Sequence, residues 1–281
     1  MRLIILVLFT GALLTGCLQP TETGPARQVF KNVAYGTHPR QVLDLYLPAG
    51  RSLATTPLLL LIHGGSWTTG DKADLNAVVD TLQRRLPDFA VANMNYRLAT
   101  NGQNLFPTQE QDVQEAVQFL FDSHNTYLFS TRFSLLGASA GGHLALLHSY
   151  KSNTPVAVKS VASFFGPTDL TVMYNHPPNP LVPLALQQVT GTTPALNAAL
   201  YQQASPINFV GTITPPTFIA HGDADLVVPY SQSEALNNRL RSQGVASVLV
   251  RIGGLGHGDW PNAIYSQVYT ELQTFLLNYA R

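Results

Sequence analysis

A serine set among very small residues is the first chemical signal in this chain of 281 residues. The stretch Gly137-Ala138-Ser139-Ala140-Gly141 follows an apolar run and precedes a helix-like run. This G-x-S-x-G pattern predicts a tight strand-to-helix turn, whose strained backbone lifts the serine hydroxyl clear of the sheet. Side chains at Gly137 and Gly141 would collide with the neighbouring strand and helix. The chemistry that such a hydroxyl can perform is nucleophilic attack.

A candidate base and two candidate acids follow Ser139 along the chain. Asp223 and Asp225 come after a strand expected over 217–220, and His257 comes after a later strand. Loops that follow parallel strands open at one edge of a sheet, so these side chains should converge on the serine. The imidazole would accept the serine proton, and the carboxylate would fix its tautomer and stabilise the cation.

The choice between the two aspartates depends on the string H-G-x-x-D-x-x-V-P, which starts at His221. It resembles a hydrolase loop in which the later aspartate is the catalytic one. That resemblance favours Asp225 and gives His221 a structural role. Asp223 stays open as the alternative acid.

A glycine-bearing loop, HGGSW at residues 63–67, follows the strand expected over 58–62. Glycines let backbone N–H groups turn toward an oxyanion that develops during reaction. We expect Gly64 to shape the turn and His63 to brace the loop by hydrogen bonding. The expected N–H donors are Gly65, Ser66 and Ala140.

The N-terminal residues have the layout of a secretory signal. Arg2 is followed by an apolar stretch that is too short to span a membrane. Leu14-Thr15-Gly16-Cys17 resembles the bacterial lipobox, and Cys17 is the only cysteine in the chain. We therefore expect a signal peptide at 1–16, a lipidated Cys17 and tether at 17–27, and one folded domain at 28–281. The expected location is the cell envelope, with residue 18 favouring the outer membrane.

Composition excludes other classes of function. The formal net charge is zero and only 11% of residues are charged, so an electropositive nucleic-acid interface is not expected. A single cysteine provides neither a disulfide framework nor a cysteine-based metal site. No feature of the sequence indicates an oligomeric state.

The elements that must position these residues alternate between strands and helices. Such alternation predicts an α/β fold with a mostly parallel central sheet and helices on both faces. An early antiparallel hairpin should lie at one edge. The proline-rich segment 168–212 breaks the pattern, and we expect it to be a lid or binding loop that contains only short helical pieces. The expected strands cover 28–35, 41–47, 58–62, 89–94, 133–136, 158–165, 217–220 and 247–252, and the expected helices cover 72–86, 108–121, 140–150, 230–242 and 261–279.

Taken together, these motifs make the chain similar to serine esterases of the α/β-hydrolase fold. The similarity is to the feruloyl/acetyl-xylan esterase (BD-FAE-like) group and to hormone-sensitive-lipase-like carboxylesterases. It is carried by LDLYLP (43–48), HGGSWTTGDK (63–72), GASAGGHLAL (137–146) and HGDADLVVP (221–229). The resemblance implies hydrolysis of short acyl or acetyl esters, including carbohydrate-linked ones, by a Ser-His-Asp triad without cofactor or metal. Candidate pocket residues are Trp67, Trp260, Tyr174, Leu181, Val182 and Leu184.

Three other functions stay open at this point. HGGSW also fits the HGGxW form of arylformamidases, although their soluble substrate suits an envelope anchor poorly. A serine peptidase related to prolyl oligopeptidase shares the serine and aspartate motifs. A non-catalytic binding module is the third, but such modules usually lack a triad residue and none is missing here.

The lipobox yields a direct test. Replacing Cys17 with Ser should move the chain from the membrane fraction of a bacterial host to the soluble fraction, because acyl chains contribute about 0.8 kcal/mol per buried CH₂ to anchoring. Fractionation and labelling with radioactive palmitate measure this, with Thr15→Ser as the control. A wild-type chain that takes up no palmitate would contradict the prediction.

Overall fold

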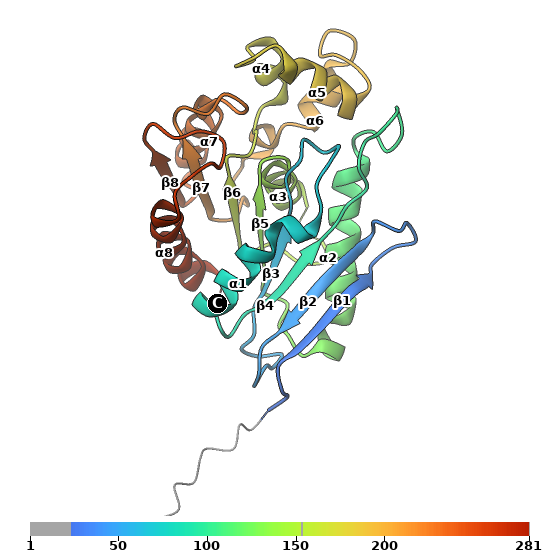
Figure 1. Ribbon diagram of the computed structural model, residues 1–281, viewed down its shortest axis with the longest axis vertical. Helices are drawn as coiled ribbons and strands as arrows, with labels where there is room; N and C mark the ends of the chain where they lie inside the picture. Colours follow the sequence, from blue (N-terminus) through green and yellow to red (C-terminus); the bar gives the residue numbers. More distant parts are fainter. Residues whose placement is uncertain (1–23, 153, 281) are drawn as a thin grey trace, which may run out of the picture.

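A computed structural model describes residues 24–152 and 154–280, and these residues form one eight-stranded sheet flanked by helices (Figure 1). The strand order is β1-β2-β4-β3-β5-β6-β7-β8. Strands from β4 to β8 in this order run parallel, whereas β1 and β2 form the expected antiparallel hairpin at one edge. The strands are β1 (Gln28–Ala34), β2 (Val42–Leu47), β3 (Leu58–Ile62), β4 (Ala90–Met94), β5 (Phe133–Ala138), β6 (Ser160–Phe164), β7 (Thr217–Gly222) and β8 (Ser247–Ile252).

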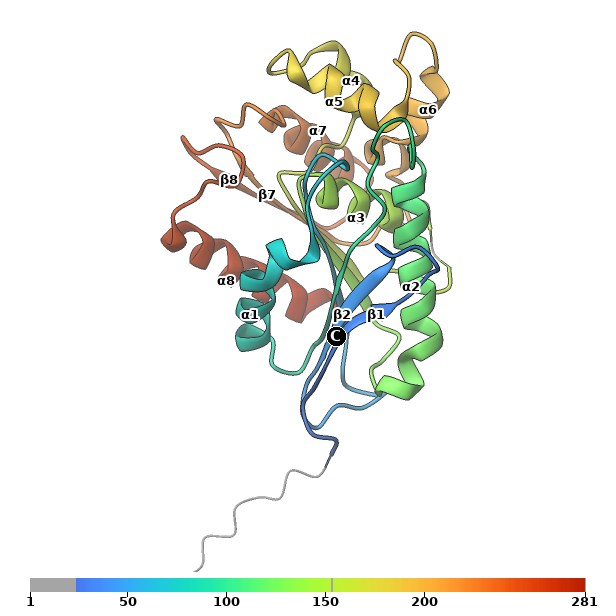
Figure 2. The ribbon, with the colours of Figure 1, turned by 45° about the vertical axis from the view of Figure 1, so that its right-hand side comes forward.

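Helices cover both faces of this sheet, so the expected α/β fold class is confirmed. α2, α3 and α7 pack on one face and α1 and α8 on the other, as the turned view makes clear (Figure 2). Helices α4 to α6 lie beyond the carboxyl ends of the strands (Figure 1). The helical elements are η1 (Lys72–Leu75), α1 (Asn76–Arg85), α2 (Thr108–Tyr127), α3 (Ala140–Lys151), α4 (Leu170–Asn175), α5 (Leu181–Thr190), α6 (Ala198–Gln203), η2 (Pro206–Phe209), α7 (Tyr230–Ser242) and α8 (Asn262–Tyr279).

The sequence of β3 explains why it lies at the centre of the sheet. Its five residues, LLLLI, are all fully buried. Successive side chains of a strand point to opposite faces. Leu58, Leu60 and Ile62 therefore enter the core beneath α2 and α3, while Leu59 and Leu61 enter the core beneath α1 and α8.

Segment 168–212 forms a group of short helices. It folds into α4, α5, α6 and η2. The short helical pieces expected here are present, and polar side chains cap two of them: Asp169 accepts from the Val172 N–H and Asn197 from the Leu200 N–H. Apolar residues then hold the segment onto the body, among them the fully buried Tyr201.

The predicted signal peptide (1–16) and Cys17 lie outside the described residues, as does most of the predicted tether. Within residues 24–152 and 154–280, no helix combines the length and the apolarity needed to cross a membrane.

Helix α3 is enclosed on all sides, and it carries two buried histidines. Every residue from Ala140 to Tyr150 is buried. His143 donates from Nε2 to the Ala204 carbonyl at 2.6 Å, whereas His148 Nε2 has no hydrogen-bond partner among the described residues. Burial lowers the pKa of each imidazole to about 4, and it lowers the pKa of buried His63 to a similar value.

These buried histidines predict an acid-sensitive fold. An unfolded histidine binds its proton below about pH 6.5, whereas these three stay neutral in the folded state until about pH 4. The free energy of unfolding should therefore decrease as the pH falls between these values. His148→Leu, which removes an unpartnered buried nitrogen, should reduce the slope by about one proton, or about 1.4 kcal/mol per pH unit.

Urea unfolding at several pH values between 7 and 4 measures this slope. The exposed His176 provides the control, because His176→Leu should leave the slope unchanged. An unchanged slope in His148→Leu would show that this histidine does not cause the acid sensitivity.

Candidate active site

The turn between β5 and α3 presents Ser139 in a strained conformation. Its φ of 53° and ψ of −121° lie outside the regions that non-glycine residues ordinarily occupy. The Ser139 N–H donates to the Phe164 carbonyl at 2.8 Å, and the Ser139 carbonyl accepts from His143 N–H at 3.0 Å. The turn is thus held between strand β6 and the first turn of α3.

The steric reason proposed for the two glycines is confirmed. A Cβ at Gly137 would lie 2.1 Å from the Gly141 carbonyl oxygen in α3. A Cβ at Gly141 would lie 2.0 Å from the Ile62 carbonyl oxygen at the end of β3. Helix α3 can approach the sheet this closely only because neither position carries a side chain.

The structure brings Ser139, His257 and Asp225 together in one hydrogen-bonded chain. Ser139 Oγ lies 2.9 Å from His257 Nε2, and His257 Nδ1 donates to Asp225 Oδ2 at 2.6 Å. The three residues come from the loops that follow β5, β8 and β7. This arrangement positions the imidazole to take the hydroxyl proton while the carboxylate fixes its tautomer.

Asp225 is a buried carboxylate with many donors around it. Burial alone would raise its pKa, but hydrogen bonds from His221 and His257 outweigh that effect and hold the pKa well below its usual range. The Val227 and Val228 N–H groups also donate to Oδ1, at 2.7 and 2.9 Å. Asp225 therefore stays ionised beside His257.

Asp223, the alternative acid, is directed elsewhere. It accepts from Arg251 Nε at 2.8 Å and from the Gly254 N–H at 2.6 Å. These bonds tie together the loops after β7 and β8. His221, expected to be structural, lies beneath Asp225 and donates to it from Nε2 at 3.0 Å.

Three successive residues of the HGGSW loop have positive φ angles, which glycine adopts more readily than other residues. Gly65, Ser66 and Trp67 have φ values of 105°, 51° and 60°. A Cβ at Gly65 would lie 2.3 Å from the Thr69 carbonyl oxygen. Ser66 therefore occupies a left-handed conformation without the freedom of glycine, at a cost of order 1–3 kcal/mol.

Three N–H groups near Ser139 are free to bind an anion. The N–H groups of Gly65, Ser66 and Ala140 donate to no acceptor within residues 24–152 and 154–280. Ser66 and Ala140 line the same pocket as Ser139, whereas Gly65 does not line it. Gly64 lies against the nucleophile, since a Cβ there would come within 3.2 Å of Ser139 Cβ.

A small apolar pocket of about 40 Å³ opens beside Ser139. The lid and the loop after Asp225 form most of its wall. Val182 and Trp67 line it, as the sequence suggested. The full lining is Ser66, Trp67, Ser139, Ala140, Pro167, Met173, Val182, Ala185, Leu186, Val227 and Val228.

Three suggested pocket residues lie elsewhere. Tyr174 packs edge-on against Tyr201 within the lid and accepts from Gln187. Leu181 and Leu184 are on the outer side of α5, 69% and 60% exposed. The helical period of α5 places Val182, Ala185 and Leu186 on the pocket side instead, a choice that periodicity alone could not make.

Trp260 is also not a pocket residue. Its indole is buried in the core beneath α8 and donates to the Gly256 carbonyl at 2.9 Å. Its ring meets the Phe165 ring edge-on, and Phe165 in turn lies 4.6 Å from the His257 ring. Trp260 thus supports the histidine loop rather than contacting a ligand.

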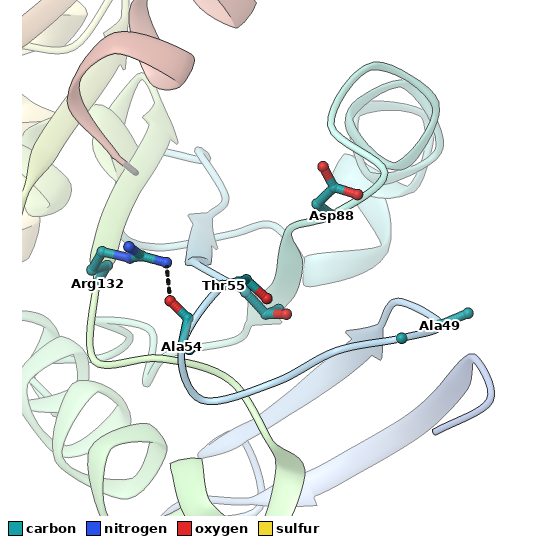
Figure 3. Close-up of a pocket in the computed structure, with 7 residues that line it drawn as sticks. Ala49, Ala54, Thr55, Asp88 and Arg132 are labelled. Atoms are coloured by element: carbon teal, nitrogen blue, oxygen red, sulfur yellow. Dashed lines mark hydrogen bonds between the residues drawn. The ribbon is translucent and has the colours of Figure 1, made fainter. Parts of the chain in front are cut away.

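Larger hollows are also present, and one of them reaches Ala138 and Phe165, next to the hydrogen-bonded chain. One of about 320 Å³ is lined by Ala54, Thr55, Asp88 and Arg132, where Arg132 donates to the Ala54 carbonyl (Figure 3). Arg132 precedes β5, so this hollow lies at the opposite end of the strand from Ser139. Another, of about 650 Å³, lies between α1 and α8.

No group of three or more His, Cys, Asp and Glu side chains suited to a metal is present among the described residues.

Sequence reasoning missed several residues that support the site. Phe165, at a φ of 42°, places its ring beside His257. His143 accepts from the Trp67 indole at 3.2 Å and so joins the HGGSW loop to α3. Tyr96 stacks on His63 with ring centroids 4.3 Å apart. Each lies far along the chain from its partner, and no local pattern marks such a contact.

Several proteins similar in sequence to this chain are named as esterases. The BD-FAE family model matches residues 43–240. Esterase LipQ of Mycobacterium tuberculosis is 28% identical over 87% of this chain, and the probable carboxylic ester hydrolase LipM of the same organism is 29% identical over 75%. The matches cover only 59% and 51% of those two proteins' own lengths.

Solved structures share the fold. A truncated carbohydrate esterase from gut microbiota superposes with a TM-score of 0.79 at 25% identity, covering 92% of this chain and 97% of its own. A bifunctional GH43-CE protein from Bacteroides eggerthii superposes with a TM-score of 0.76, also at 25% identity. That match covers 88% of this chain and 37% of the other.

The contacts of the two aspartates predict different effects on the reactivity of Ser139. Asp225→Asn should slow the labelling of Ser139 by a fluorophosphonate about a hundred-fold or more, because the amide no longer holds His257 in its proton-accepting tautomer. Asp223→Asn is the matched control and should label at nearly the wild-type rate. Mass spectrometry of the labelled protein against time measures both rates. Slow labelling in the Asp223 variant alone would reverse the assignment of the acid.

Proposed function

Because the chain belongs to the BD-FAE family, we propose that it is a serine carboxylesterase that hydrolyses short-chain acyl or acetyl esters. The observation that carries this proposal is the hydrogen-bonded chain from Ser139 through His257 to Asp225 at the mouth of a small apolar pocket. The esterase names of its relatives support the same chemistry.

The geometry supports the following proposed reaction. Ser139 Oγ attacks the ester carbonyl while His257 Nε2 takes its proton, and Asp225 stabilises the imidazolium that results. When the tetrahedral intermediate collapses, the alcohol leaves with the proton from His257 and the acyl group stays on Ser139. A water molecule then attacks the acyl-enzyme, with His257 again acting as the base, and the acid is released.

The oxyanion of each tetrahedral intermediate needs donors beside Ser139. We propose the N–H groups of Gly65, Ser66 and Ala140, each of which has no other acceptor in the described chain. Ala140 is the first residue of α3, so the positive end of the helix dipole adds to its effect. Each such donor contributes about 10²–10³ in rate.

The proposed acyl site is small. A volume of about 40 Å³ accommodates a few heavy atoms, and the side chains of Met173, Val182 and Leu186 close it from the lid. An acetyl group fits such a space without rearrangement, whereas a long chain would have to displace α5. This favours acetyl and other short acyl groups.

The alcohol part of the substrate is proposed to be carbohydrate-linked. The structural similarity to a carbohydrate esterase from gut microbiota supports this, since the superposition covers 92% of this chain and 97% of that one. The lipobox at Cys17 supports an envelope location, anchored at the outer membrane, where such an ester would be met.

Hydrolysis of p-nitrophenyl acetate, butyrate and decanoate tests the proposal. Activity should decrease steeply with chain length because of the closed pocket. Ser139→Ala should lower kcat by about 10⁴–10⁶, because it removes the nucleophile of a unit that acts together. Purified wild type and variant are compared at equal concentration.

Two results would count against the proposal. Turnover that persists in Ser139→Ala would mean that the hydroxyl is not the nucleophile. A preference for decanoate over acetate would mean that the lid does not limit the acyl group.

A further inference from the structure

The peptide group between Gly64 and Gly65 is held firmly at its carbonyl end. The Gly64 carbonyl oxygen accepts from His63 Nδ1 at 2.7 Å. The Tyr96 hydroxyl shares its proton between the Gly64 carbonyl at 3.2 Å and the His63 carbonyl at 3.1 Å. A trans peptide is planar, so fixing its C=O also fixes its N–H in the opposite direction. The N–H in question belongs to Gly65, one of the proposed oxyanion donors.

The hydrogen bond from His63 depends on which ring nitrogen carries the proton. A neutral imidazole has one donor and one acceptor nitrogen. Nδ1 faces the Gly64 carbonyl, which can only accept, so this hydrogen bond forms when Nδ1 carries the proton and Nε2 is the acceptor. Burial lowers the pKa of His63 to about 4, so the ring is neutral near pH 7.

Arg40 faces the acceptor nitrogen. Its Nη2 lies 3.5 Å from His63 Nε2 and also donates to the Gly70 carbonyl at 2.8 Å. Its Nε donates to the Tyr96 carbonyl at 2.9 Å, and Nη1 lies 3.8 Å from Asp71. A guanidinium offers donors only, so the nitrogen that faces it is favoured as an acceptor.

The same guanidinium also binds the two residues that pack against the His63 ring, Tyr96 and Gly70. Tyr96 stacks on the His63 ring at an interplanar angle of 12°. Gly70 leaves no room for a side chain, since a Cβ there would lie 2.7 Å from both the Gly64 oxygen and His63 Nδ1. Arg40 binds the backbone of both residues, although it lies in the turn between β1 and β2.

We infer that Arg40 is a positioning residue of the oxyanion site: it selects the Nδ1–H tautomer of His63 and so orients the Gly64–Gly65 peptide toward the reacting carbonyl. The inference rests on the proposed function for its catalytic consequence. Arg40 lines no part of the pocket beside Ser139, so it acts through the residues that it contacts, which are His63, Tyr96, Gly70 and Asp71.

Substitution of Arg40 tests the catalytic consequence. Arg40→Met keeps the length of the side chain but removes its donors, and it should lower kcat for p-nitrophenyl acetate about ten-fold with KM little changed, because oxyanion donors act in the transition state. Arg40→Lys, which keeps a cationic donor, should restore most of kcat.

Arg51 supplies a matched control at the other end of the hairpin. It is a buried arginine that also donates to backbone carbonyls, those of Tyr127 and Ala26, at 2.9 and 2.6 Å. Arg51→Met should lower the melting temperature and leave kcat unchanged. A kcat loss no larger in Arg40→Met than in Arg51→Met would overturn the inference, as would a change in KM alone.

The tautomer of His63 is measured independently of activity by ¹⁵N NMR of protein labelled at histidine, with the signal assigned by comparison with His63→Asn. The wild type should have Nδ1 protonated, and Arg40→Met should have a mixture of tautomers. A wild-type ring protonated at Nε2, or an unchanged tautomer in Arg40→Met, would overturn the inference. Absence of Ser139-dependent hydrolysis in the wild type would instead refute the proposed function, and the NMR result would still decide the role of Arg40 at His63.

Discussion

The close approach of helix α3 to the central strands is the constraint on which the rest of the site depends. With no side chain at Gly137 or Gly141, the helix begins within contact distance of the end of β3, and the chain between must turn sharply. That turn forces Ser139 to a positive φ and directs its hydroxyl away from the sheet. Hydrogen bonds to Phe164 and from His143 hold the strained residue in place. The strain is sustained because α3 is buried on every side.

Parallel strands bring the other parts of the site to the same edge. The loops after β3, β5, β7 and β8 begin at that edge, and they carry the HGGSW residues, Ser139, Asp225 and His257 respectively. Each loop is then fixed by a neighbour: His221 supports Asp225, Phe165 supports His257, and His63 supports the HGGSW loop. The buried histidines His63 and His143 stay neutral, so each provides one donor and one acceptor of fixed position.

The lid determines the size of the space that Ser139 faces. Short capped helices give segment 168–212 a definite shape, and the inner side of α5 closes the pocket with Val182, Ala185 and Leu186. The Asn179 side chain donates to the Leu226 carbonyl at 2.6 Å, which ties the lid to the loop that carries Asp225. The dimensions of the pocket and the position of the acid are therefore linked through one segment.

The sequence by itself determined the α/β class, the edge hairpin, the steric need for Gly137 and Gly141, and the family resemblance, because these follow from local periodicity and short motifs. It also named the residues that the structure brings together at Ser139, since loops after parallel strands must meet. Only the tertiary structure showed that Asp225 contacts His257 whereas Asp223 contacts Arg251. It also placed Trp260 and Tyr174 outside the pocket and Arg40 against His63. These outcomes depend on which side chains from distant segments meet, and on which face of a short helix is buried. Neither is encoded in spacing along the chain.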